Sequence, residues 1–77
     1  MILKVISAED VLFEGEVDSV MLPGAKGSFT VLHNHASLIS TLTPGTISYR
    51  HGAEDGAIDI AGGLVDVDDN VVSVCIY

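Results

Sequence analysis

Turn-forming residues interrupt this sequence every ~8 to 12 positions, and this spacing limits the possible folds more than any other feature. The predicted turns are Ala8–Asp10, Pro23–Gly27, Thr43–Gly45, His51–Gly56 and Asp69–Asn70. Proline presets φ, glycine reaches positive φ, and Asp and Asn tolerate the left-handed region, so each segment has a physical reason to turn. The runs between the turns are rich in β-branched residues, and none of them offers a long amphipathic helix. The spacing therefore predicts an all-β fold, either a sandwich or a barrel.

Extended segments are expected between these turns. They are residues 2–7, 11–22, 28–32, 36–42, 46–50, 57–61, 64–68 and 71–76. A bulge is predicted at Gly15, because an isolated glycine inside a strand often marks one. The pair Gly62-Gly63 indicates a bulge or a close approach of two backbones inside the sheet. A single short helical turn near residues 35–42, where apolar residues fall at helical spacing, is the alternative to a strand there.

The chain has 77 residues, which predicts one domain over residues 1–77 with a modest core. Domains of this size commonly depend on a disulfide, a metal or a partner. Cys75 is the only cysteine, so no internal disulfide is possible, and its place in an alternating valine and isoleucine run predicts a small buried side chain. No apolar run approaches the ~20 residues that a membrane span needs, so no direct insertion into the bilayer is expected.

Charge narrows the choice of partner. Eleven carboxylates stand against three basic residues, which gives a formal net charge of −8. This charge repels nucleic acid and anionic lipid, whose recognition needs clustered lysine and arginine. Lys4, Lys26 and Arg50 lie on three different segments and form no cluster. Nucleic acid is therefore excluded, and a protein with a basic surface is favoured, because opposite charge speeds association.

Candidate catalytic and metal-binding residues are few. His33 and His35 lie two apart, so a strand would place both on one face, a spacing that some metal sites use. No cysteine accompanies them and the nearest carboxylate is many residues away, so an exposed polar loop is favoured. Residues 66–70 begin like a calcium loop, but Val71 and Tyr77 stand where that loop needs glycine and glutamate. No nucleophile elbow is present. We expect no enzyme activity, no cofactor and no metal.

The stretch from Val20 to Leu32 is the strongest candidate for a binding surface. It is apolar at both alternating positions of its expected strands. A strand of this kind needs cover on both faces, and in a small domain the second cover is often another chain. An interface that includes Met21 and Val31 is favoured, and a core with one solvated face is the alternative.

Several runs carry a resemblance to a known family. Residues 14–24 read E-G-E-V-D-S-V-M-L-P-G, which resembles the F-EGEVDSV-LPG stretch of the epsilon subunit of F-type ATP synthases. Residues 27–40 read G-S-F-T-V-L-H-N-H-A-S-L-I-S and are similar to that family's G-E-F-G-V-L-P-G-H-A-P-L-I. Further similar runs follow in the same order at 42–45, 62–67 and 70–74. The resemblance covers essentially the whole chain.

The resemblance implies a fold and a function. The fold would be an antiparallel β-sandwich of about ten strands, the N-terminal domain of a subunit in the central rotor stalk. That subunit docks on the gamma subunit and on the polar loops of the membrane c-ring, and helps couple proton translocation to ATP synthesis without a catalytic residue of its own. Its place would be the cytoplasmic face of the bacterial inner membrane. The basic residue usual in c-ring loops would suit the charge of −8.

The family's ring-facing loop corresponds to Ser28 and residues 33–37 of this sequence, and His35-Ala36 matches the family. Together with the apolar stretch, this gives one set of expected contact residues: Met21, Ser28, Phe29, Val31, His33, His35 and Ser37.

The sequence also departs from the family pattern. His33-Asn34 stands in place of Pro-Gly, Ser37 in place of proline, and Ser28 in place of a frequent acidic residue. These changes are expected to loosen the turn and to remove one charge aimed at the ring. Family members usually continue into a C-terminal helical hairpin that can inhibit ATP hydrolysis and in some members binds ATP. The sequence stops at Tyr77, either because the protein is naturally short or because the chain was cut, and in both cases neither helix-based inhibition nor ATP binding is expected of these residues.

Two other functions stay open. One is a general β-sandwich adaptor for another soluble protein. The other is a metal- or ligand-binding module that uses His33, His35 and His51.

Overall fold

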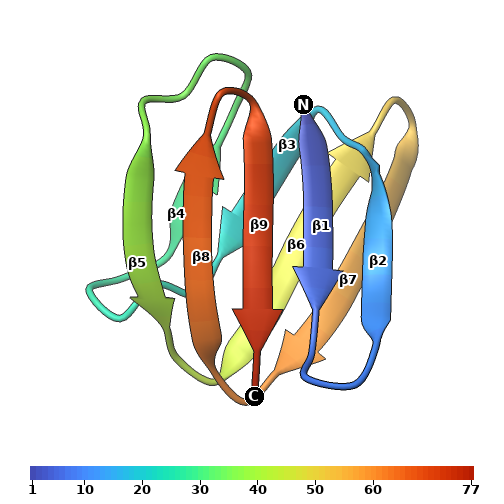
Figure 1. Cartoon of the computed structure of the whole chain (residues 1–77). Coiled ribbons are helices and arrows are strands. Elements are labelled where there is room, and N and C mark those ends of the chain that lie inside the picture. Colours follow the sequence, from blue (N-terminus) through green and yellow to red (C-terminus); the bar gives the residue numbers. More distant parts are fainter.

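Nine β-strands and no helix make up the computed structural model, which describes residues 1–77 (Figure 1). In chain order the strands are β1 (Ile2–Ile6), β2 (Val11–Glu16), β3 (Ser19–Leu22), β4 (Phe29–Val31), β5 (Leu38–Leu42), β6 (Gly45–His51), β7 (Glu54–Ile60), β8 (Gly63–Asp68) and β9 (Val71–Ile76). They form a five-stranded sheet, β2-β1-β9-β8-β5, and a four-stranded sheet, β4-β3-β6-β7. The two sheets lie face to face as two layers (Figure 1). The predicted all-β sandwich is confirmed.

Strand pairing is antiparallel except at the centre of the five-stranded sheet. There β1 runs parallel to β9, from Ile2 beside Val71 to Ile6 beside Cys75. Parallel neighbours need a long connection, and here almost the whole chain lies between them. The expected purely antiparallel pairing is therefore corrected. The strand number is nine rather than ten, and the expected long strand over residues 11–22 divides as the chain passes from one sheet to the other.

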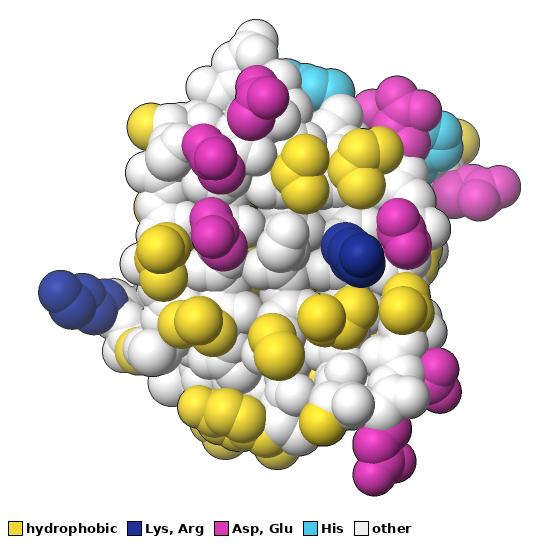
Figure 2. All heavy atoms as spheres, viewed as in Figure 1, with side chains coloured by type: hydrophobic (Ala, Val, Ile, Leu, Met, Phe, Trp, Pro, Cys, Tyr) yellow, Lys and Arg dark blue, Asp and Glu magenta, His cyan; other side chains and the backbone are white.

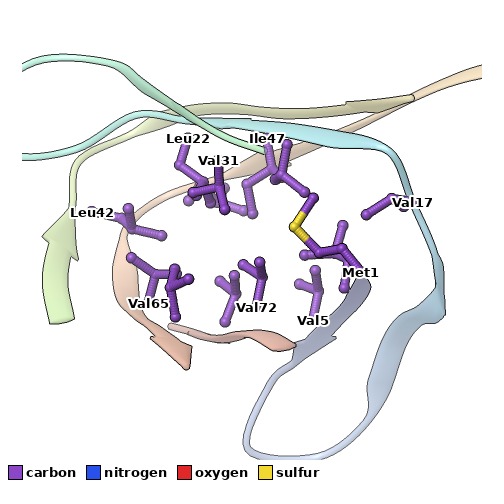
Figure 3. Packing of buried hydrophobic residues seen from close by; sticks show 14 residues of the cluster. Met1, Val5, Val17, Leu22, Val31, Leu42, Ile47, Val65 and Val72 are labelled. Carbon is purple, nitrogen blue, oxygen red and sulfur yellow. The ribbon is translucent and has the colours of Figure 1, made fainter. Parts of the chain in front are cut away.

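Fourteen buried apolar side chains fill the space between the sheets (Figure 3). They are Met1, Leu3, Val5, Val17, Val20, Leu22, Val31, Leu42, Ile47, Ile60, Val65, Val67, Val72 and Val74. Along β8 every second residue is buried, because successive side chains of a strand point to opposite faces. No polar side chain is buried with them. The core is thus built almost entirely from the inward positions of the strands.

Different contacts close the two sides of the sandwich. On one side the rings of Phe13 and Tyr49 pack with their centroids 4.4 Å apart. Gly56 lies opposite Tyr49 in the β6–β7 pair, and a Cβ there would overlap the tyrosine ring. On the other side, an isolated bridge joins Gly24 to Leu42 and so connects the four-stranded layer to β5.

The β-bulge lies close to the β1–β2 turn, so its predicted position at Gly15 is wrong. The register shifts between Val5 and Ile6, which leaves Leu12 as the extra residue. Gly15 pairs in register with Leu3. Gly15 does not mark a bulge. Its small size leaves room for the ring of Phe13.

The segment near residues 35–42 contains a strand, so the helical alternative is wrong. Strand β5 pairs with β8 from Leu38 opposite Val67 to Leu42 opposite Gly63. Leu38 and Leu42 lie at inward positions of this strand, which explains their apolar character with a period of two instead of a helical period.

The glycine pair at the start of β8 permits a close backbone approach, as predicted. A Cβ on Gly63 would overlap the backbone carbonyl of Cys75 on the neighbouring strand. Gly62 has a φ of 149°, a value that other residues rarely adopt. Cys75 itself is exposed, so the prediction of a buried thiol is wrong. Its strand turns Val72 and Val74 inward, and the alternate position of Cys75 faces outward.

The structure has no helix with the length and apolar character needed to pass through a membrane.

Candidate partner-docking surface

The predicted contact residues lie on β3, β4 and the two loops that flank β4. Their environments differ: Met21, Ser28, His33 and Ser37 are exposed, Phe29 and His35 are partly buried, and Val31 is fully buried. Six of the seven thus offer some surface to a partner.

Val31 has no exposed surface, so its place among the contact residues is corrected. It pairs with Val20, which is also fully buried, and both side chains point into the core. The neighbouring pair, Met21 and Thr30, therefore points outward. Apolar residues at both alternating positions predicted that both faces of these strands are covered. The strand pairing instead assigns Val20 and Val31 to the core and Met21 to the outer face.

Met21 lines a shallow hollow on the outer face of the four-stranded sheet. The hollow has a volume of about 480 Å³. Ser48 lies beside Met21 on β6, and Ala57 lies beside Ser48 on β7, so short side chains surround the exposed methionine. The ion pair between Arg50 and Asp55 lies at its edge, with Nε 2.7 Å from Oδ1. The hydrogen bond and charge of Arg50 lower the pKa of Asp55. This hollow can receive an apolar side chain of a partner.

The loop between β4 and β5 is held by side-chain hydrogen bonds. The Asn34 N–H donates to Oδ1 of Asn70 at 2.6 Å, and Nδ2 of Asn70 donates to Oδ1 of Asn34 at 3.1 Å. The Ser37 hydroxyl donates to Oδ1 of Asp68 at 2.7 Å. These bonds tie the loop, which carries His33, His35 and Ser37, to the β8–β9 turn.

The backbone conformation of this loop suits asparagine at position 34, where the sequence departs from the family pattern. Asn34 and Asn70 have φ values of 62° and 61°. Asparagine tolerates this left-handed region because its short polar side chain can form local hydrogen bonds. Asn34 thus adopts a conformation otherwise supplied by glycine and adds two hydrogen bonds to Asn70. These bonds act against the expected loosening of this turn.

The three histidines do not gather around one point. His33 lies 3.9 Å from Asp18, measured from Nε2 to Oδ1, and the Gly52 N–H donates to Oδ2 of Asp18 at 2.7 Å. This hydrogen bond, with the nearby imidazoles of His51 and His33, lowers the pKa of Asp18. The ring of His35 instead lies 2.7 Å from the carbonyl oxygen of the following residue. No group of three or more His, Cys, Asp or Glu side chains has a metal-binding arrangement.

A second apolar surface, on the outer face of the five-stranded sheet, was missed by the sequence reasoning. Six of the nine exposed large apolar residues lie on its strands: Ile2, Val11, Leu12, Ile39, Leu64 and Val71. Figure 2 shows apolar side chains across this face, with carboxylates among them. The sequence signal for this surface was the alternation of residue types along each strand. The exposed apolar residues form a continuous surface only once the strands are paired, and the pairing cannot be seen in the sequence.

The family comparison agrees with this fold. The model of the family described as the ATP synthase, Delta/Epsilon chain, beta-sandwich domain matches residues 1–76. The chain belongs to this family. A relative named ATP synthase epsilon chain, from Leptospira borgpetersenii serovar Hardjo-bovis, is 44% identical over 72 residues, which cover 94% of this chain and 57% of the relative. The ATP synthase epsilon chain of Caulobacter vibrioides is 46% identical over 64 residues, covering 83% of this chain and 74% of that protein.

Solved structures of ATP synthases contain the same fold. A chain in the cryo-EM structure of the Euglena gracilis mitochondrial ATP synthase, OSCP/F1/c-ring, superposes with a TM-score of 0.91 at 24% identity. The superposition covers 99% of this chain and 49% of that one. A chain in the central stalk/c-ring structure of the Tetrahymena thermophila enzyme gives a TM-score of 0.82 at 14% identity and covers 99% of this chain and 62% of that chain. The delta/epsilon β-sandwich thus spans between 49% and 62% of the length of three of these four proteins.

Proposed function

We propose that this delta/epsilon β-sandwich is a non-catalytic subunit of the rotor stalk of an F-type ATP synthase. In this role it docks on the gamma subunit and on the polar loops of the c-ring, and helps couple proton translocation to ATP synthesis. The observation that carries the proposal is the family match over residues 1–76, in agreement with relatives named ATP synthase epsilon chain. The bacterial relatives support a place in a membrane-associated complex, and the proposed position is peripheral, on the cytoplasmic face of the bacterial inner membrane.

The β4–β5 loop and Ser28 are the proposed contacts with the c-ring loops. His33, His35 and Ser37 lie on this loop, which the Asn34–Asn70 hydrogen bonds hold in one conformation. A preorganised loop loses less conformational freedom on binding, which favours affinity. The net charge of −8 favours a basic partner surface.

The proposal assigns the domain a mechanical role instead of a chemical one. The three groups with shifted pKa values, Asp18, Arg50 and Asp55, are exposed and have partners within the domain. Their shifts follow from these local hydrogen bonds and charges, which are ordinary for structural ion pairs. A domain that transmits torque needs a stable fold and firm contacts, and it needs no reactive group.

Co-purification tests this function. The chain would be co-expressed with the affinity-tagged gamma subunit of the same organism, and we expect it to elute with gamma in equal amounts. Met21→Glu should reduce its recovery, because the substitution places a charge in the hollow proposed to receive a partner. Ala53→Glu adds the same charge at the exposed β6–β7 turn and serves as the matched control. Elution of the unmodified chain without gamma would contradict the proposal.

A functional measurement complements this binding assay. Membranes stripped of the epsilon chain would receive the domain, and proton-driven ATP synthesis would be recorded before and after addition. We expect synthesis to rise with the amount of bound domain, with no ATP hydrolysis by the isolated domain.

A further inference from the structure

All three histidines of the chain lie at one end of the sandwich, the loop end. It is formed by the N-terminus, the β2–β3 link, the β4–β5 loop, the β6–β7 turn and the β8–β9 turn (Figure 1). His33 and His35 lie in the β4–β5 loop, and His51 is the last residue of β6. The histidine side chains visible in Figure 2 lie along its upper edge, and the opposite end, with the β1–β2 turn and the β3–β4 loop, has no histidine. The imidazoles, which gain their charge between pH ~5 and ~8, are thus confined to the end that carries the proposed contact loop.

Carboxylates outnumber the other charged groups at the loop end. The charged groups there are the carboxylates of Glu16, Asp18, Glu54, Asp68 and Asp69, the Met1 amine and the Arg50 guanidinium. Glu54 lies opposite His51 in the β6–β7 pair, and Arg50 is bound to Asp55. The strands β3, β4 and β5 contribute no charged side chain. Protonation of the three histidines would therefore offset more than half of the negative charge of these five carboxylates.

Asp18 is the carboxylate that lies within 4 Å of a histidine. Its Oδ2 accepts a hydrogen bond from the Gly52 N–H at 2.7 Å, and its own N–H donates to the carbonyl oxygen of Arg50 at 2.7 Å. Its Oδ1 accepts no hydrogen bond from the domain and lies 3.9 Å from Nε2 of His33, which is beyond hydrogen-bond range. The side chains of Asp18 and His33 are 51% and 54% exposed. Oδ1 is thus held in place and open to a donor from outside.

Two kinds of donor can bind this oxygen, and pH selects between them. A neutral imidazole carries no charge to attract the carboxylate, so near pH ~8 Oδ1 is open to a lysine or arginine of a partner surface. A protonated imidazole is a charged donor, and His33 would need to move its Nε2 only ~1 Å closer to form a charge-assisted hydrogen bond. The hydrogen bond from Gly52 is the main cause of the lowered pKa of Asp18, and the nearby histidines add to it, so the carboxylate stays ionised over this range.

We propose that docking of the loop end on a basic partner surface is controlled by pH, because protonated His33 competes with the partner for Asp18. This control rests on the proposed function, in which the β4–β5 loop docks on the c-ring. Protonation of His35 and His51 acts in the same direction, because it reduces the negative charge that attracts a basic partner. His33 is one of the positions at which the loop departs from the family pattern, so the control is specific to chains with histidine there.

Titration of the Asp18 carboxyl carbon by NMR tests the contact with His33 in the isolated chain. We expect His33→Gln to raise the pKa of Asp18, because the variant lacks a neighbouring positive charge. His35→Gln is the matched control and should leave the pKa of Asp18 unchanged, because the ring of His35 lies 2.7 Å from the carbonyl oxygen of Ala36 instead. Both positions lie outside the core, so the variants should keep the fold. The same pKa of Asp18 in the parent and in His33→Gln would overturn the inference.

Affinity measured at two pH values tests the consequence for docking. The probe is the purified complex of the gamma subunit and the c-ring of the same organism, at about pH 8 and about pH 5.5. We expect the parent chain to bind about fivefold less tightly at the lower pH, as expected for the loss of one exposed charge contact. His33→Gln should lose no more than about twofold, because the competing donor is absent. Asp18→Asn keeps an acceptor for the Gly52 N–H and should bind weakly at both pH values.

The same affinities separate this inference from the proposed function. An equal loss of affinity at low pH in the parent and in His33→Gln would retain docking on the rotor and reject control by His33. The absence of binding by the parent at both pH values would reject the proposed function and this inference with it.

Discussion

Asn70 is the residue whose replacement should most directly free the β4–β5 loop. Its side chain accepts a hydrogen bond from the Asn34 N–H at 2.6 Å and donates one to the Asn34 side chain at 3.1 Å. Its own φ of 61° also lies in the left-handed region. Three variants separate these roles: Asn70→Gly keeps the backbone conformation and removes both bonds, Asn70→Ala also adds strain, and Asn70→Asp keeps the acceptor.

The expected losses follow from these interactions. A hydrogen bond contributes ~0.5–1.5 kcal/mol net, and exposed ones lie near the lower limit, so Asn70→Gly should cost about 1–2 kcal/mol. Placing alanine in the left-handed region costs about 1 kcal/mol more, which gives ~2–3 kcal/mol for Asn70→Ala. Asn70→Asp should cost ~1 kcal/mol or less. For a domain of this size, 1–2 kcal/mol lowers the unfolding temperature by about 4–16 °C.

Thermal unfolding followed by far-ultraviolet circular dichroism gives the stability order, and amide exchange by NMR gives the local effect. The Asn34 amide should lose its protection in Asn70→Gly and keep most of it in Asn70→Asp, while amides in the strands change only with global stability. If the Asn34 amide is equally protected in all three variants, the Asn70 side chain does not hold the β4–β5 loop in place. Equal stability of Asn70→Gly and Asn70→Ala would refute the contribution of backbone strain.

Three further outcomes follow from the fold. Gly56→Ala should destabilise the domain by about 1–3 kcal/mol in urea unfolding, because its Cβ overlaps the Tyr49 ring, and the cost should vanish in a Tyr49→Val background. The lowered pKa of Asp18 means that its contribution to stability is present above its unfolded value near 3.8 and is lost as pH falls through the folded value. The unfolding temperatures of the parent and Asp18→Asn should therefore converge on acidification. Val31→Asp should abolish folding by circular dichroism, whereas Met21→Asp should change stability by no more than ~0.5 kcal/mol.

The strands and turns were predictable because they depend on local chemistry. Asp69 and Asn70 adopt positive φ at the expected turn, and β8 and β9 show the expected period of two. Which alternating position faces the core depends instead on strand pairing. For this reason Val31 was assigned to the surface and Cys75 to the core, and the structure places each on the opposite side.

Non-local pairing also explains what was missed at the candidate docking surfaces. The Asn34–Asn70 hydrogen bonds join residues 36 positions apart, and no local motif marks such a pair. The exposed apolar side chains of the five-stranded sheet likewise come from several strands, so they form no continuous run in the sequence. The resemblance identified the family and the loop near His35, because those features are continuous in sequence.

The parallel pairing of β1 with β9 has a consequence for synthesis in the cell. The first strand of this domain pairs with its ninth, so the five-stranded sheet stays divided until the residues of β9 leave the ribosome. Until then, β1 and β2 can form only a hairpin, and two-stranded hairpins are marginally stable in water. Contacts between distant parts of a chain also slow folding. The nascent domain therefore exposes the inner faces of its early strands until β9 has been made, and during that time chaperones that bind apolar segments have access to them. The core is then completed in one late step.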